Sequence, residues 1–238
     1  MNQEIKKIRW YMGPEAFDEA VRLGWIAGGA VRAAYANENI SDVDIFFSGE
    51  TARLSLEAEL MELGYTRTFN SGNAVSWVKD FGNRKARLQT IKKYFDCPSA
   101  CLNAFDFTVC QAAIIKNPEN KPFVMQGPAF MQDLAGRQLI INRATPYPLS
   151  TVIRCQKYVK KGYTIRPCEM VQLLIQCARL KLETLQDWKD HLMGIDMVLL
   201  NALFIQMEKE AEGNPDTIFD VQRLMDMIDE YVPEGEDE

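Results

Sequence analysis

The spacing of apolar residues over the first part of the chain predicts alternating helices and strands. Apolar residues at helical spacing follow Pro14, which suits the first position of a helix, and end at Gly24. A period of two, leading into a continuous apolar run, is typical of a strand. The order that this predicts is a helix over 14–24, a strand over 25–27, a glycine pair, a helix over 30–36 and a strand over 42–47.

The same pattern continues to about residue 145. Gly64 is a plausible stop for a helix over 54–63, and Ser-Gly-Asn and Phe-Gly-Asn sequences supply turns between strands. Strands are expected over 65–69, 74–78, 87–91 and 104–115, and short helices over 97–102 and 128–134. We therefore expect an α/β (α+β) domain with a mixed sheet, covering residues 1–145.

The pattern becomes helical after a Thr-Pro-Tyr-Pro sequence at 145–148. Helices are expected over 150–161, 168–182, 185–207 (in one or more pieces) and 215–231. Residues 207–238 carry 12 acidic and 2 basic residues. We therefore expect an all-helical domain over 146–232 and an acidic, disordered tail over 233–238.

Composition narrows the class of protein. No run of about 18 apolar residues occurs, so no membrane span is expected. The first residues lack the apolar core of a signal peptide, and a cytoplasmic location is the default expectation. The chain has six cysteines without a Cys-x-x-Cys pair and only one histidine, His191, which argues against structural zinc. The net charge of −6 gives no support for a broad nucleic-acid footprint.

Candidate chemistry centres on Asp42 and Asp44, which are expected on one face of a strand. Two unit charges about 4 Å apart repel by roughly 4 kcal/mol at an effective dielectric near 20, and divalent cations remove that cost. Mg²⁺ prefers carboxylates together with phosphate oxygens and water. Asp106, expected on a separate buried strand, is the natural third ligand of a two-metal site. A calcium loop is disfavoured because its sixth position is Phe47 and its twelfth is Arg53.

Gly28-Gly29, followed after a twelve-residue spacer by Asp-Val-Asp-Ile, resembles the signature of the polymerase-β-type nucleotidyltransferase superfamily. Gly-Gly-Ala-Val-Arg at 28–32 is closest to the head domain of CCA-adding enzymes and bacterial poly(A) polymerases, and Phe-Asp-Phe-Thr at 105–108 is similar to their Asp-Phe-Thr element. Asp133-Leu134, Leu139 and the helix bearing Arg154 resemble their passage from head to neck. The chain departs from the family at Ala33, where an acid is usual, and at Ala104-Phe105, which replace two arginines.

This resemblance implies a magnesium-dependent nucleotidyltransferase, in which a hydroxyl attacks the α-phosphate of a nucleoside triphosphate such as ATP and pyrophosphate leaves. Asp42, Asp44 and Asp106 would bind two Mg²⁺ ions and act as the catalytic residues. The triphosphate would be bound by Gly28, Gly29, Arg32 and Arg154, and the acceptor by Lys157 and Lys161. An RNA 3′ end (tRNA-like), a protein as in toxin-type transferases, and a small molecule all remain open as acceptors. The alternative from another class is a non-catalytic nucleotide- or RNA-binding regulatory module on the same fold.

Overall fold

The computed structural model describes residues 2–143, 145–182, 185–192 and 205. The chain divides into two compact units. Residues 1–145 and 162–166 form the first, and residues 146–161 and 167–238 form the second. The chain therefore returns briefly to the first unit at 162–166, which the sequence did not predict. Among the described residues, no helix is both long enough and apolar enough to cross a membrane.

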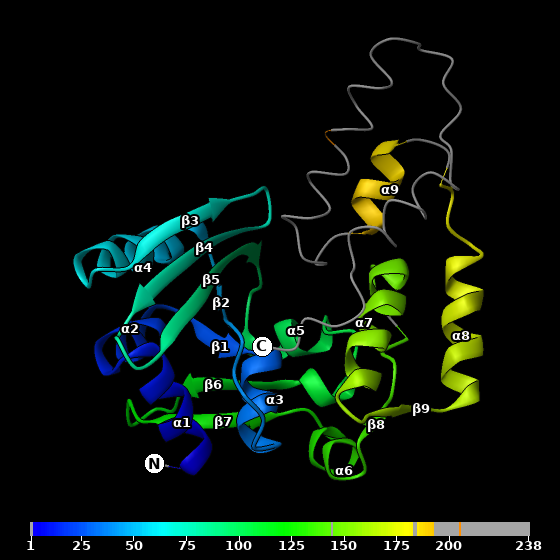
Figure 1. Ribbon diagram of the computed structural model, residues 1–238, viewed down its shortest axis with the longest axis horizontal. Coiled ribbons are helices and arrows are strands. Elements are labelled where there is room, and N and C mark those ends of the chain that lie inside the picture. Colours follow the sequence, from blue (N-terminus) through cyan, green and yellow to red (C-terminus); the bar gives the residue numbers. More distant parts are fainter. Residues whose placement is uncertain (1, 144, 183–184, 193–204, 206–238) are drawn as a thin grey trace. The chain divides into compact units, whose positions relative to one another are not determined.

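The first unit contains a mixed seven-stranded sheet, as the sequence predicts, in the order β3-β4-β5-β2-β1-β6-β7 (Figure 1). All neighbouring strands are antiparallel except β2 and β5, which are parallel. The strands are β1 Trp25–Ala27, β2 Val43–Phe47, β3 Thr66–Asn70, β4 Ala74–Asp80, β5 Lys85–Tyr94, β6 Ala112–Lys116 and β7 Pro122–Gln126. A second, two-stranded parallel sheet pairs β8 Gln138–Leu139 with β9 Thr164–Ile165.

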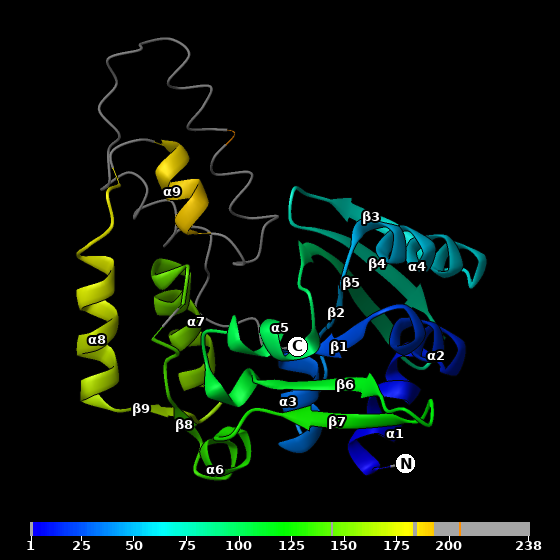
Figure 2. The same ribbon diagram turned by 180° about the vertical axis from the view of Figure 1, so that it is seen from behind.

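The helices of the first unit are α1 Gln3–Met12, α2 Pro14–Leu23, α3 Gly29–Tyr35, α4 Glu50–Glu62, α5 Pro98–Asn103 and α6 Phe130–Ala135. In the chain, α1 and α2 precede β1, α3, α4 and α5 lie between strands of the large sheet, and α6 follows β7. Seen from either side, β3 and β4 lie at one end of the large sheet and β6 and β7 at the other (Figure 2). The described part of the second unit contains α7 Pro148–Lys160, α8 Pro167–Cys177 and α9 Leu185–His191. The helix predicted over 215–231 and the tail predicted over 233–238 lie outside the described residues.

Helix α4 packs on one face of the sheet through apolar and polar contacts. Leu56 and Leu60 are fully buried, which contributes roughly 1.5–3 kcal/mol each. Glu57 of the same helix accepts a 2.7 Å hydrogen bond from the Thr90 hydroxyl on β5. Thr90 in turn accepts a 3.2 Å hydrogen bond from the Trp77 indole on β4. This buried chain of hydrogen bonds fixes which face of β4 and β5 is covered by α4.

Helix α5 covers the opposite face, around β1, β2 and β6. Its residues Cys101 and Leu102 pack in one apolar cluster with Phe46 of β2 and with Ala27 and Ala113 of β1 and β6. In β2, Phe46 alternates with Ile45, which is paired in register with Thr90 on the α4 side. Because neighbouring residues in a strand point to opposite faces, α4 and α5 lie on opposite sides of the sheet.

The strand predicted over 104–115 is wrong in its first half. Only Ala112–Lys116 forms a strand, and Thr108–Cys110 form a 3₁₀ turn, η1. Phe107 makes an isolated bridge to Ile141, and the N–H of Asn142 donates to the carbonyl of Asp106 at 2.7 Å. This segment bonds to the chain at 140–142 rather than to a strand of the main sheet. A period of two therefore arose there without a strand of the main sheet.

Candidate functional site

The two predicted carboxylates lie at the beginning of β2, next to the end of β1. Asp44 is paired in register with Ala27 on one side and with Gln89 of β5 on the other. Asp42 lies just before the strand and accepts a 2.7 Å hydrogen bond from the Ser41 hydroxyl. Both aspartates are half-buried. Only Asp44 lies within the strand, so the prediction that the two side chains share one face stays a prediction.

The negative charge of each carboxylate raises the pKa of one neighbouring side chain, which is Tyr11 for Asp42 and Cys101 for Asp44. Burial raises the pKa of the Tyr11 hydroxyl, and the negative charge of Asp42 raises it further. Burial likewise raises the pKa of the Cys101 thiol to about 12, and the charge of Asp44 adds to that rise. Lys93 acts on the same thiol and lowers its pKa. The start of β2 is therefore an electronegative position with a lysine nearby.

The glycine pair connects this position to helix α3. Gly28 has φ 84° and ψ −133°, a conformation that L-residues with a side chain rarely adopt. A Cβ atom at Gly28 would lie 2.9 Å from the Phe105 ring, whereas one at Gly29 would meet no atom within 4 Å. The two glycines therefore have different reasons to be glycine. Gly28 permits a backbone turn under Phe105, and Gly29 borders open space.

The N–H groups of the two glycines also differ. The Gly28 N–H donates to the carbonyl of Ala112 at 3.1 Å, which joins the turn to β6. This N–H therefore already has a backbone acceptor, and the predicted binding of the triphosphate by Gly28 stays a prediction. Gly29 is the first residue of α3, and the first N–H groups of a helix have no acceptor within the helix.

Asp106 follows α5 in the connection that leads to the 3₁₀ turn, and it is 7% exposed. Its neighbour Phe105 packs edge-on against Phe46, with ring centroids 5.7 Å apart. Across the part of the chain that the structure describes, no three His, Cys, Asp or Glu side chains form a group that could hold a metal ion. Asp106 thus does not join Asp42 and Asp44 in such a group, and its metal role stays a prediction.

Arg32 lies on α3 within a buried cluster of side chains. Its guanidinium lies 2.6 Å from the Glu38 carboxylate and donates a 3.0 Å hydrogen bond to the Tyr163 hydroxyl. Arg137 approaches the same carboxylate at 3.9 Å. Both guanidinium groups lie over the Tyr163 ring, 5.5 and 5.6 Å from its centroid. The predicted contact of Arg32 with phosphate stays untested, and the structure gives this side chain a role in holding α3 to residues 162–166.

The remaining predicted residues lie in the second unit. Arg154 and Lys157 are on α7, and Lys161 follows its last residue. Arg154 is half-buried and Lys157 is exposed. Their predicted roles in nucleotide and acceptor binding stay predictions.

The donor atoms of Asp42 and Asp44 fit Mg²⁺. Carboxylate oxygens are hard ligands, and Mg²⁺ completes its six positions with water and substrate phosphate rather than with an all-protein cage. Two carboxylates close together in the chain beside a glycine turn are therefore a suitable donor set for a metal–triphosphate complex. The resident ions would be held by these two side chains.

Two residues beside the site were missed by sequence reasoning. Gln89 lies next to Asp44 only because β5 pairs in parallel with β2. Glu38 is the partner of Arg32. A signal existed for Glu38, since it is an acid close in sequence to Arg32, and position 33, where an acid is usual, is Ala. Gln89 had no local signal.

Comparisons with known proteins bear on the fold and on the family separately. The chain resembles Thermotoga maritima CCA-adding enzyme complexed with tRNA, with a TM-score of 0.55, 16% identity, and 85% of this chain and 54% of that chain covered. A CCA-adding enzyme with ATP gives a TM-score of 0.51 at 18% identity, over 71% of this chain and 44% of that one. At such identities the likeness shows the fold, which is that of a nucleotidyltransferase.

The sequence comparisons point to one family. The chain is 29% identical over 231 residues to "Gabija anti-defense 2" of Bacillus phage SPbetaL7, covering 96% of this chain and 54% of the relative. It thus spans about half the length of that relative. The model of the Gabija anti-defense 2 family matches residues 4–137, which include the whole large sheet and the carboxylates of β2. The chain therefore belongs to the Gabija anti-defense 2 family.

Proposed function

We propose that this chain is a magnesium-dependent nucleotidyltransferase, and that it counters antiphage defence by transferring a nucleoside monophosphate to an acceptor hydroxyl. The observation that carries the proposal is the position of Asp42 and Asp44. Asp42 lies just before β2 and Asp44 lies within it, paired in register with Ala27 at the end of β1, after which the glycine turn leads to α3. The nucleotidyltransferase-like fold supports the proposed reaction, and the anti-defense family supports the proposed role against antiphage defence.

The proposed reaction is an in-line displacement at the α-phosphorus of a nucleoside triphosphate. A bond forms between the acceptor oxygen and the α-phosphorus, the bond from that phosphorus to the bridging oxygen breaks, and pyrophosphate leaves. Bound Mg²⁺ supplies charge neutralisation at the phosphates and acidifies the attacking hydroxyl. Asp42 and Asp44 would hold the ions, and a carboxylate of this pair would accept the hydroxyl proton. The N–H of Gly29 is available to a phosphate oxygen at the start of α3.

A biochemical assay tests this proposal. The purified protein is incubated with Mg²⁺ and each α-³²P-labelled nucleoside triphosphate, with acceptors from an extract of Gabija-bearing cells separated into RNA, protein and small molecules. We expect label in one fraction and release of pyrophosphate. Exchange of Asp42 and Asp44 for Asn should abolish both, since Asn carries no charge to hold the ions. The matched control is exposed Asp96→Asn, which should transfer label at the wild-type rate.

The double variant should also fold normally. Removing two like charges that are close together in the chain relieves their repulsion, so the thermal unfolding midpoint should stay equal or rise. A phage-infection assay in Gabija-bearing cells then connects chemistry and context, with loss of protection expected for the double variant. Absence of label and pyrophosphate with every triphosphate and every fraction would overturn the proposal.

The rival is a non-catalytic binding module on the same fold. What favours it is that no group of three potential metal-ligating side chains occurs among the described residues. This module would keep nucleotide binding without Mg²⁺ and would protect phages equally well after both Asp→Asn exchanges. Calorimetric titration of ATP with and without Mg²⁺ separates the two, because the proposed enzyme should bind the triphosphate more tightly with the cation.

A further inference from the structure

A single row of side chains crosses five strands of the large sheet and passes through Asp44. In register, Phe69 of β3 is paired with Ser76 of β4, and Ser76 with Gln89 of β5. Gln89 is paired with Asp44 of β2, and Asp44 with Ala27 of β1. Residues paired in register point to the same face of a sheet. These five side chains therefore line one face, which is the face that α5 covers near Ala27.

Burial divides this row into a covered part and an open part. Ala27 and its partner in β6 are fully buried beneath α5. From Asp44 outward, Gln89, Ser76 and Phe69 are all only partly buried. Their sequence neighbours that point the other way, such as Trp77 and Leu88, are buried on the α4 side. The open part thus offers a carboxylate, an amide, a hydroxyl and an aromatic ring in that order.

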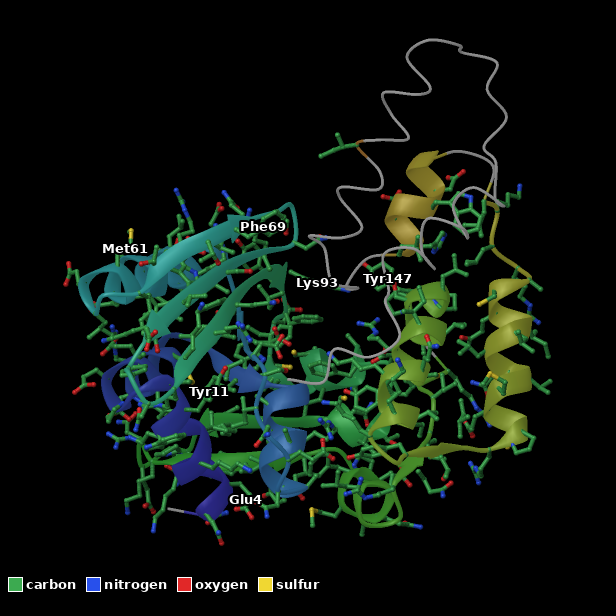
Figure 3. The ribbon with its side chains drawn as sticks, in the orientation of Figure 1. Glu4, Tyr11, Met61, Phe69, Lys93 and Tyr147 are labelled. Carbon is green, nitrogen blue, oxygen red and sulfur yellow. The ribbon has the colours of Figure 1, made fainter. Side chains whose placement is uncertain are left out.

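The spacing of this open part follows from the sheet itself. Neighbouring strands lie about 4.8 Å apart, so Gln89, Ser76 and Phe69 stand roughly 5, 10 and 14 Å from the line of Asp44. Phe69 and Lys93, labelled in Figure 3, lie on β3 and near the end of β5. Arg87, two residues from Gln89 on the same strand, points to the same face and is exposed. Lys93 acts electrostatically on the same Cys101 thiol as Asp44.

The chemistry of this row matches a nucleoside. An aromatic ring on an open sheet face can stack a base, as sheet-based RNA-binding domains do. An amide such as that of Gln89 donates and accepts at once, which suits the edge of a base, and a hydroxyl suits the edge or a ribose. Arg87 and Lys93 flank the row with positive charge for phosphates. Within the row itself, the Asp44 carboxylate at the reacting end is the one charged group.

We propose that Phe69, Ser76 and Gln89 form a nucleoside-binding row, which holds the base and ribose of a nucleotide ligand while its reacting group lies at Asp44. This inference rests on the proposed function for the reacting end and extends it by naming the substrate class along β3–β5. A nucleoside can come from the incoming triphosphate or from the 3′-terminal nucleotide of a single-stranded nucleic acid. Both present the same chemistry to the row.

Binding measurements separate these sources without requiring turnover. One arm titrates wild-type and variant protein with α,β-methylene-ATP in Mg²⁺ by calorimetry. The other measures the anisotropy of a 5′-fluorescein single-stranded RNA decamer at one fixed salt concentration. Phe69→Ala should weaken one of these ligands by roughly 5- to 150-fold, the range expected for loss of one stacked base. Phe69→Trp should restore binding because it restores the ring.

Matched controls and the transfer assay decide what a negative result means. Phe123→Ala removes a partly exposed phenylalanine from β7, away from the row, and should bind both ligands as the wild type does. Gln89→Ala should weaken the same ligand as Phe69→Ala. If Phe69→Ala and Gln89→Ala bind both ligands like the wild type while label transfer persists, the row is refuted and the proposed function stands. If the row variants lose binding and the wild type transfers no label, the row stands and the proposed function falls. Label on an extract protein, with unaltered rates in both variants, would also overturn the row, because transfer would then not depend on these side chains.

Discussion

Exchange of Glu38 for Gln probes whether Arg32 is held in a structural cluster. The Arg32 side chain is 3% exposed and lies 2.6 Å from the Glu38 carboxylate, whose side chain is 18% exposed. Gln keeps the size of Glu but removes the charge that compensates the buried guanidinium. Removing one partner of a buried ion pair costs about 3–5 kcal/mol. Because Glu38 has some access to water and the contact of Arg32 with Tyr163 remains, we expect the lower limit, about 3 kcal/mol.

The assay is thermal unfolding followed by near-ultraviolet circular dichroism, which reports the tertiary packing of aromatic side chains. In a chain of this length, about 3 kcal/mol lowers the unfolding midpoint by roughly 6–12 °C. The matched control is Glu119→Gln. Glu119 lies 3.0 Å from Lys121, but the two side chains are 69% and 75% exposed, so its loss should cost less than about 1 kcal/mol. The buried pair should also keep its effect in high salt, which screens exposed pairs more strongly.

Equal midpoints for Glu38→Gln and Glu119→Gln would refute the structural role of Arg32. A double exchange, Arg32→Met with Glu38→Leu, adds a second criterion. Replacing both partners of a buried ion pair with apolar residues is often neutral, so the double variant should be more stable than Glu38→Gln alone. A double variant less stable than Glu38→Gln would count equally against the reasoning.

Two further predictions concern the glycine turn and the cysteines. Gly28→Ala should destabilise the fold by about 1–3 kcal/mol or more, because φ at Gly28 is positive and the new Cβ would approach Phe105 to 2.9 Å. Gly29→Ala should fold at least as well as the wild type in urea titrations, and should lose nucleotidyl transfer if a phosphate approaches that position. Normal folding of Gly28→Ala would contradict the first expectation, and unaltered transfer by Gly29→Ala would contradict the second. Iodoacetamide at pH 8 should modify exposed Cys97 and spare buried Cys101, as measured by peptide mass spectrometry. The pKa of Cys97 is lowered chiefly by a hydrogen bond with a nearby serine, whereas the pKa of Cys101 is raised to about 12. The sign follows because only the thiolate reacts, and equal labelling of both thiols in the folded protein would refute this assignment.

Local patterns predicted most elements of the first unit because those elements obey local rules. The apolar stripe between Pro14 and Gly24 became α2, and the apolar run at 43–47 became β2. The error at 104–115 has the opposite cause, because residues 106–108 bond to the chain at 140–142 rather than to a strand of the main sheet. Strand β7 was missed because Pro122–Gln126 is stabilised by its partner β6 rather than by a strong pattern of its own.

The candidate site divides in the same way. Asp42 and Asp44 were found from their spacing, since a period of two is expected to put both on one face of a strand. The glycine turn was found from its sequence, but the sequence cannot show that the Gly28 N–H donates to Ala112, a residue 84 positions away in the chain (112 − 28). Asp106 was identified as a buried carboxylate, and its burial was right, but its place outside a three-ligand group depended on the turn after α5.

By itself, then, the sequence determined the local features: the glycine turn, the pair of carboxylates, the mixed α/β order and the change to helices after residue 145. Only the tertiary structure decided which distant residues meet at the start of β2. The parallel pairing of β5 with β2 places Gln89 beside Asp44, and the return of the chain at 162–166 places Tyr163 on Arg32. The physical reason is that the direction and register of strand pairing are chosen by the packing of the whole sheet, whereas turns and amphipathic faces are set by neighbours in the chain.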